Sequence, residues 1–158
     1  MAKRILRVYA DTSVFGGVFD EEFSDGSRTF FDQVRAGRFL LIVSATVRDE
    51  IDAAPPHVKD LFRSLVPIAQ VVETTDEAVA LRNAYLNAGI VSAKSIADAL
   101  HVASATTCGA SLVVSWNFAH IVHFDKIPLY NGVNAANGYP SIAIYSPLEV
   151  IGYEDENF

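Results

Sequence analysis

The sequence predicts an α/β domain of three layers, in which a mainly parallel sheet lies between two layers of helices. Short apolar runs of strand length alternate along the chain with longer segments whose apolar residues recur at helical spacing. The chain has 158 residues, and 51% of them are hydrophobic, which suits a single domain with a sizeable core. We assign this domain to residues 1–150 and regard residues 151–158 as a C-terminal tail.

The first third of the chain is expected to form a strand, a helix and a second strand. Residues 5–10 are mostly apolar, as in a short buried strand. The glycine pair at 16–17 is expected to break any regular structure that follows, and residues 24–27 to form a turn. A helix with an apolar face is then expected over 28–36, ended by a glycine. Residues 39–43 are continuously apolar, which indicates a strand covered on both faces.

The middle of the chain is expected to contain three helices and one strand. Ser44 is suited to cap a helix that the proline pair at 55–56 stops. A second helix over 57–65 and a short strand over 70–73 are expected next. Thr75 is suited to cap a third helix, whose apolar residues have helical spacing and which a glycine ends.

The last third is expected to begin with a helix over 95–107 and to continue with a strand over 112–115. A helical turn over 118–124 and a last strand over 141–145 follow. Between them, the Asn- and Gly-rich residues 131–138 are expected to form an irregular loop. Because α/β folds bind ligands beyond the carboxyl ends of their strands, residues at those ends are the candidates for function.

Four side chains with oxygen atoms stand near such positions. Asp11 follows the first strand, and Asn117 follows the strand over 112–115. Glu50 lies two turns into the helix after the second strand, and Asp98 lies in the first turn of its helix. Hard divalent ions such as Mg²⁺ and Mn²⁺ prefer carboxylate and amide oxygens, and they can activate water for attack on a phosphodiester. The set therefore predicts a metal site for phosphodiester hydrolysis.

Each of these residues also has an ordinary structural interpretation. Asp11 could cap the segment that follows its strand, and Glu50 has acidic neighbours, as on a solvated helix face. Asp98 follows Ser95 at the spacing of a capping box, which is the better interpretation when Asp98 is taken singly. Asn117 is a typical loop residue. The metal prediction therefore depends on the whole set.

Composition limits the class of protein further. A net charge of −7 argues against a broad basic face for nucleic acid, although bound metal would neutralise part of a carboxylate cluster. The single cysteine, Cys108, cannot form an internal disulfide, and no Cys/His spacing indicates zinc. No apolar run is long enough to cross a bilayer. We expect a cytoplasmic protein without membrane contact.

Several histidines and aromatic residues are secondary candidates. His101 is expected to be partly buried, with its ring bound to a backbone carbonyl. His120 and His123 are expected to be structural or peripheral. Trp116 and Phe118 could stack on a base, although large aromatic residues beside a strand more often belong to the core.

Four motifs, in this order along the chain, resemble those of the PIN-domain family and, within it, the toxin nucleases of the VapC type. They lie at residues 8–13, 47–51, 96–105 and 113–118. The most specific is the third, in which Asp98 is followed by Ala-Leu-His and an alanine-rich helix. The resemblance extends over nearly the whole chain, to residues 146–150.

This resemblance implies a PIN-like fold, an acidic pocket that binds Mg²⁺ or Mn²⁺, and cleavage of RNA. The first three acidic positions of the family match Asp11, Glu50 and Asp98. The fourth position is usually Asp, whereas this chain has Asn117, which supplies no charge and puts a second ion in doubt. Ser13 and Ser115 are expected to orient the ligands.

The function expected from all this is a divalent-metal-dependent endoribonuclease, the toxin of a type II toxin–antitoxin pair. Its expected partners are the RNA substrate, a cognate antitoxin and a second copy in a homodimer. A degenerate PIN domain that binds RNA or a protein without cleaving is the alternative, which Asn117 keeps open. A haloacid-dehalogenase-type phosphatase is disfavoured, because Ser13 stands where that class places an acidic residue.

Overall fold

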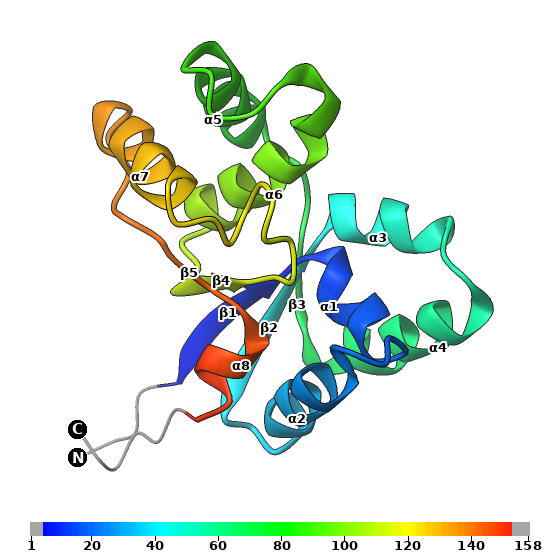
Figure 1. The fold of residues 1–158 in the computed structure, drawn as a ribbon. Coiled ribbons are helices and arrows are strands. Elements are labelled where there is room, and N and C mark those ends of the chain that lie inside the picture. Colours follow the sequence, from blue (N-terminus) through cyan, green and yellow to red (C-terminus); the bar gives the residue numbers. More distant parts are fainter. Residues whose placement is uncertain (1–4, 153–158) are drawn as a thin grey trace, which may run out of the picture.

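The computed structural model describes residues 5–152, which form a five-stranded sheet between helices (Figure 1). All neighbouring strands are parallel, in the order β3-β2-β1-β4-β5. The strands are β1 Leu6–Ala10, β2 Phe39–Ser44, β3 Gln70–Val72, β4 Leu112–Val114 and β5 Ala143–Tyr145. The parallel sheet predicted from the sequence is confirmed, and each strand overlaps the apolar run that predicted it.

Helices cover both faces of the sheet, which gives the predicted three layers (Figure 1). Helices α1, α2, α4 and α8 pack together on one face, and α5, α6 and α7 on the other, while α3 contacts α1, α4 and α6. The helices are α1 Thr12–Gly17, α2 Ser24–Arg35, α3 Ala45–Asp52, α4 Pro56–Leu65, α5 Asp76–Asn87, α6 Ile96–Thr107, α7 Lys126–Ala136 and α8 Pro147–Val150. Two short 3₁₀ helices, Val66–Ile68 and Ala93–Ser95, precede β3 and α6.

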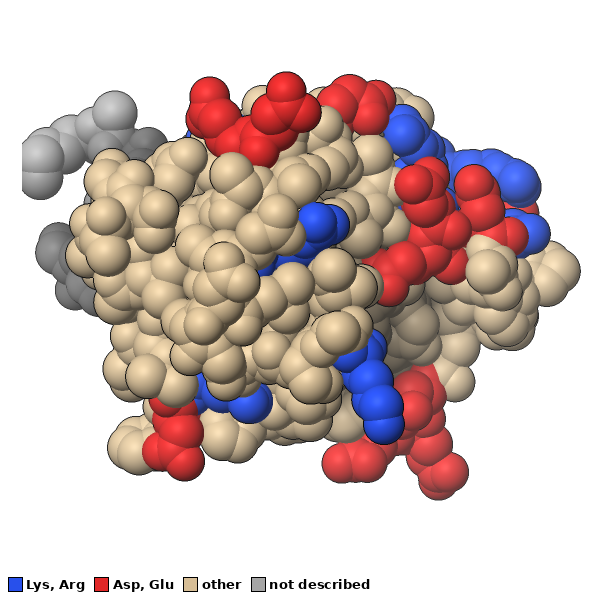
Figure 2. Space-filling model, turned by 90° about the horizontal axis from the view of Figure 1, so that it is seen from above, with Lys and Arg blue, Asp and Glu red and all other residues tan. Residues whose placement is uncertain are grey.

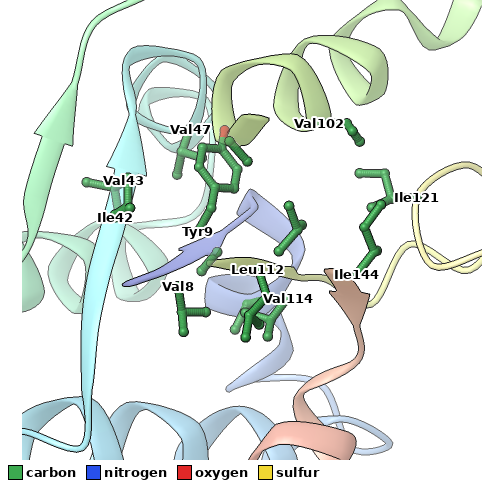
Figure 3. Packing of buried hydrophobic residues seen from close by; sticks show 14 of the residues in the cluster. Val8, Tyr9, Ile42, Val43, Val47, Val102, Leu112, Val114, Ile121 and Ile144 are labelled. Carbon is green, nitrogen blue, oxygen red and sulfur yellow. The ribbon is translucent and has the colours of Figure 1, made fainter. Parts of the chain in front are cut away.

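The core lies on both faces of the central strands. Val8 and Val114 are completely buried, as expected for strands that helices cover on both sides (Figure 3). Tyr9 is equally buried, but its hydroxyl points out of the apolar cluster toward α6 (Figure 3). A buried hydroxyl needs a hydrogen-bond partner, so Tyr9 connects the core to the polar groups described below.

The helix caps predicted at Ser44 and Thr75 are confirmed. The side-chain oxygen of Ser44 accepts the backbone N–H of Val47, and that of Thr75 accepts the N–H of Ala78. Gly37, which follows α2, has a φ of 81°, in the left-handed region that side chains rarely adopt. At these three positions the local signals give the end of the helix correctly.

Two expectations for the first third are corrected. The turn expected over 24–27 is the first turn of α2, which begins at Ser24 rather than at residue 28, and helix α1 includes Gly16 before it ends at Gly17. A Cβ on Gly17 would lie 2.7 Å from Nε1 of Trp116, so this glycine serves close packing rather than a break. The hydroxyl of Ser27 donates to the carbonyl of Val14, which joins the start of α2 to α1.

The Asn- and Gly-rich residues expected to form a loop belong instead to α7. Asn134 is fully buried and accepts a hydrogen bond from the hydroxyl of Tyr85. The side chain of Asn131 accepts the backbone N–H of Ile142 and donates to the carbonyl of the same residue. The asparagines are thus partners in tertiary hydrogen bonds, and the break comes only at Gly138, where φ is 81°.

The strand order creates a switch point between β1 and β4. From β1 the chain builds β2 and β3 on one side, and it then returns to place β4 on the other side of β1. The backbone N–H of Asp11 donates to the carbonyl of Val114 (3.3 Å), so these two strand ends are joined. Parallel α/β sheets bind ligands at such a point. Of the expected tail at 151–158, residues 153–158 lie outside the described part of the chain.

Candidate active site

Asp11 is a buried carboxylate at the switch point. Its side chain is bonded on both oxygens: Oδ1 accepts the hydroxyl of Ser13 (2.6 Å) and Oδ2 accepts the hydroxyl of Ser115 (2.7 Å). Asp11 is 4% exposed, and within residues 5–152 it forms no ion pair. A carboxylate so placed is costly to ionise unless a positive charge comes close to it.

The same two serines hold the loop that follows β4. The backbone N–H of Trp116 donates to Oγ of Ser13 (2.9 Å), and the N–H of Asn117 donates to Oγ of Ser115 (2.9 Å). Each hydroxyl therefore accepts from the loop and donates to the Asp11 carboxylate. Loop and carboxylate are thus fixed relative to each other, as expected of groups that orient a ligand.

Glu50 belongs to a second network of hydrogen bonds, which includes Thr12, the residue after Asp11. Its Oε1 accepts the hydroxyl of Thr12 (2.8 Å) and lies 2.6 Å from Nε2 of His101. The Nδ1 atom of His101 lies 2.7 Å from the Tyr9 hydroxyl, which is also 2.7 Å from Oγ of Ser44. His101 is buried, as expected, but its partners are a carboxylate and a phenol rather than a backbone carbonyl.

The two networks influence each other electrostatically. Burial raises the pKa of Asp11, against the positive charge of His101 and the two serine hydrogen bonds. Burial also acts to raise the pKa of Glu50, but the hydrogen bond and charge of His101, with the bond from Thr12, leave it below its usual value. Burial acts to lower the pKa of His101, yet the bond to Glu50 and the charges of Asp11, Glu50 and Asp98 raise it. The charge of His101 therefore favours the ionised forms of Asp11 and Glu50, and these carboxylates favour the protonated form of His101.

Asp98 lies apart from these hydrogen bonds. It is half-buried in the first turn of α6 and makes no hydrogen bond or ion pair within residues 5–152, although its charge acts on His101 and Tyr130. Ser95, its expected partner in a capping box, makes no side-chain cap. The capping interpretation of Asp98 is therefore wrong in this structure.

Asn117 is placed by the loop but does not contact Asp11 directly. Its Oδ1 accepts the backbone N–H of His120 (3.0 Å), so the amide caps the turn after β4. Its connection to Asp11 runs through Ser115. Asn117 therefore has a specific structural role in capping this turn, whereas the sequence indicated only a typical loop residue.

A divalent ion suits the chemistry of this pocket. Across residues 5–152, no group of three or more His, Cys, Asp or Glu side chains has a metal-binding arrangement. Mg²⁺, however, keeps several waters and usually takes one or two carboxylates besides substrate phosphates. Asp11 forms no ion pair and the Asp98 side chain makes no hydrogen bond among the described residues, so both carboxylates are oxygen donors of the kind that such an ion takes. The chemistry of these donors therefore fits such an ion.

Two members of the site, Tyr9 and Thr12, and the contact between His101 and Glu50 were not predicted from the sequence. Thr12 and Tyr9 stand on either side of Asp11 in its motif, and both bind the Glu50–His101 pair. Tyr9 could have been noticed, because it is the polar-tipped residue of an otherwise buried strand and points to the same side as Asp11. The pairing of His101 with Glu50 joins residues 51 positions apart, and no local signal predicts it.

The parallel sheet flanked by helices is a PIN-like α/β fold, and the carboxylate of Asp11 lies at its switch point. One similar solved structure is VapBC2 from Rickettsia felis bound to a DNA fragment from their promoter, with 10% sequence identity and a TM-score of 0.58, covering 89% of this chain and 98% of that one. Another is FitAcB from Neisseria gonorrhoeae, with 13% identity and a TM-score of 0.56, covering 89% of this chain and 98% of that one. A third is VapC20 from Mycobacterium tuberculosis, a toxin that cleaves the sarcin-ricin loop, with 11% identity and a TM-score of 0.50, covering 85% of this chain and 98% of that one. At these identities the likeness shows a shared fold. No protein-family model and no curated protein sequence matches the chain.

The surface agrees with the acidic composition. On the face seen in Figure 2, Lys and Arg side chains stand singly or beside Asp and Glu, without a broad basic area. None of the helices within residues 5–152 has the length and apolar character needed to span a bilayer.

Proposed function

We propose that this chain is a divalent-metal-dependent endoribonuclease that uses Mg²⁺ or Mn²⁺ and acts as the toxin of a toxin–antitoxin pair. The observation that carries the proposal is Asp11, a buried carboxylate without an ion pair among the described residues, at the switch point of a PIN-type sheet. A related fold in VapC20, which cleaves the sarcin-ricin loop, supports RNA as the substrate.

Asp11 and Asp98 would hold the ion, and Glu50 would contribute through its second carboxylate oxygen. When bound, such an ion provides an activated water and neutralises charge on the phosphodiester. Ser13 and Ser115 orient Asp11 through the two hydroxyl hydrogen bonds. His101 and Thr12 fix Glu50 in the same way, so the carboxylates need little rearrangement when substrate arrives.

Asn117 favours a single ion over two. It replaces the fourth acidic residue of the family, and its amide oxygen already accepts the N–H of His120. A pocket with three carboxylates has less charge to hold a second cation. The same observation favours the second candidate, a degenerate domain that binds RNA or a protein without cleaving it.

The direct test is incubation of the protein with a pool of structured RNAs in Mg²⁺, in Mn²⁺ and in EDTA. Cleavage is expected with either metal, and it should be lost in EDTA and in Asp11→Asn. Asp49→Asn is the matched control, because Asp49 is an exposed carboxylate beside Glu50 whose nearest cation is Arg48 (3.8 Å). Cleavage that persists in EDTA, or in Asp11→Asn, removes the metal role.

The proposal also includes an antitoxin and a homodimer. Two of the similar structures, VapBC2 and FitAcB, carry names of paired proteins. We expect a neighbouring gene to encode a small DNA-binding protein. That protein should co-purify with this chain and block its cleavage of RNA. Sedimentation of the purified chain alone then measures whether it forms a dimer.

A further inference from the structure

We propose that Phe118 is a stacking platform on which an unpaired base of the RNA lies beside the acidic pocket. This inference rests on the proposed function, because it names how the substrate is held at that site. Its basis is an aromatic cluster formed by Phe23, Trp116 and Phe118, in which one ring is buried and one reaches the surface.

The three rings differ sharply in exposure. Trp116 is 6% exposed, whereas Phe118 is 49% exposed. Phe23 stacks on Trp116, with ring centroids 4.4 Å apart and an angle of 18° between the planes. Phe118 lies with its centroid 6.3 Å from that of Trp116 and 6.4 Å from that of Phe23. Of the two aromatic residues that the sequence suggested for base stacking, Trp116 therefore belongs to the core and Phe118 is available.

The buried part of this aromatic cluster, the indole of Trp116, is held tightly in place. Nε1 of Trp116 donates to Oγ of Ser27 (2.8 Å). A Cβ on Gly26 would lie 2.8 Å from Cη2 of Trp116, and one on Gly17 would lie 2.7 Å from its Nε1. The indole therefore fills space that two helices leave only because both positions are glycine. A ring that stands on such a support loses little freedom when a ligand binds.

The cluster is also tied to the pocket. The N–H of Trp116 donates to the Ser13 hydroxyl, which in turn donates to Asp11. The N–H of Phe118 donates to the carbonyl of Trp116 (3.0 Å), so the exposed ring follows this anchor within one tight turn. Phe118 is thus held three residues beyond Ser115, the other hydroxyl on Asp11.

Charge explains why this protein needs such a surface. With a net charge of −7, the chain gains little from phosphate contacts, which usually dominate affinity for nucleic acid. Stacking acts through the base, requires no cation and tolerates any sequence. A base on Phe118 would bring the phosphodiester beside it to the carboxylates without a basic groove.

The test measures the affinity of an Asp11→Asn parent, which binds without cutting, for a fluorescent single-stranded oligo(A) at several salt concentrations. Phe118→Ala in this parent is expected to weaken binding roughly 5- to 150-fold, the range for one stacked base. Phe118→Tyr should bind the oligonucleotide with the affinity of the parent. Phe118→Leu, which is apolar but has no π face, should bind as weakly as Phe118→Ala. The dependence of affinity on salt should stay unchanged, because no phosphate contact is lost.

Phe124→Ala is the matched control, because Phe124 is 90% exposed and lies outside the aromatic cluster. Emission from Trp116, the single tryptophan, checks that the cluster keeps its fold in each variant. Unchanged affinity in Phe118→Ala, full affinity in Phe118→Leu, or an equal loss in Phe124→Ala overturns the proposal. If binding depends on Phe118 but the native chain does not cleave RNA, only the nuclease function is overturned. If the Asp11→Asn parent does not bind RNA at all, the stacking proposal itself is overturned.

Discussion

The Nε2 atom of His101 lies 2.6 Å from Oε1 of Glu50, and the other ring nitrogen lies 2.7 Å from the Tyr9 hydroxyl. A protonated ring donates from both nitrogens, to the carboxylate and to the phenol. Tyr9 then donates to Ser44, whose oxygen also accepts the N–H of Val47 at the start of α3. This chain of hydrogen bonds therefore begins at Glu50 and ends at the cap of the helix that carries Glu50.

Replacing His101 should change how stability depends on pH. The raised pKa of His101 means that its protonated form contributes stability that is fully present below the unfolded value of about 6.5. This contribution is lost as the pH rises through the higher folded pKa. In EDTA, urea unfolding should show a free energy that decreases on the alkaline side, and His101→Gln should lack that decrease and cost roughly 1–3 kcal/mol at neutral pH.

His57→Gln is the control for that experiment, because His57 is an exposed histidine on α4 whose ring contacts only Phe19 among described aromatic residues. It should keep the slope of the native protein. Equal slopes in all three proteins would show that the buried ring is neutral over this range.

Replacing Asp11 should stabilise the metal-free protein while removing its response to metal. Because burial raises the pKa of Asp11, its ionised form is unfavourable in the folded state above that pKa, and the penalty disappears as the pH falls through it. At neutral pH in EDTA, Asp11→Asn should therefore have an equal or higher melting temperature. Mg²⁺ at about 100 times its Kd should add about 2.7 kcal/mol to the native protein and nothing to the variant. A variant that responds to Mg²⁺ as the native chain does contradicts the assignment.

The variant Asp98→Asn distinguishes a metal-binding role of the Asp98 carboxylate from a role in stabilising the start of α6. Asp98 has no hydrogen bond within the described residues, and Ser95 does not cap α6. Without metal, this variant should unfold at the same temperature as the native protein or a higher one. A cap or helix-dipole role would instead cost up to roughly 1 kcal/mol in thermal unfolding with EDTA.

Gly26→Ala should damage the packing around Trp116. Its Cβ would lie 2.8 Å from the indole, and overpacking of this kind typically costs about 1–3 kcal/mol. Gly132→Ala is the matched control, because Gly132 lies within α7 with no atom near its added Cβ, and it should gain about 0.5–1 kcal/mol. Urea unfolding followed by tryptophan emission measures both, and equal effects would show that Trp116 moves freely aside.

Periodicity and caps were enough to predict the sheet and most helices. Ser44 and Thr75 form the expected caps, because a cap depends on side chains only a few residues apart. Gly17 was misinterpreted, since the reason for glycine there is an indole about a hundred residues further on. The same is true of Asn134, whose partner Tyr85 lies on another helix.

The site was predictable to the extent that strand ends define it. Ser13 lies beside Asp11 because it is two residues further along the chain, and Ser115 lies there because β1 and β4 are neighbours in the sheet. The bond between Glu50 and His101 depends on how α3 packs against α6, and neither helix contains a signal of its partner.

The bond from Ser115 to Asp11 joins positions 104 residues apart. During synthesis, Asp11 therefore has no such partner until β4 and Ser115 have left the ribosome. A chain that stops before β4 lacks this hydroxyl, the loop beyond it and the exposed ring of Phe118. Asp11 is therefore synthesised 104 residues before the hydroxyl that orients it, and the proposed enzyme can become active only after Ser115 has been added and β4 has paired with β1.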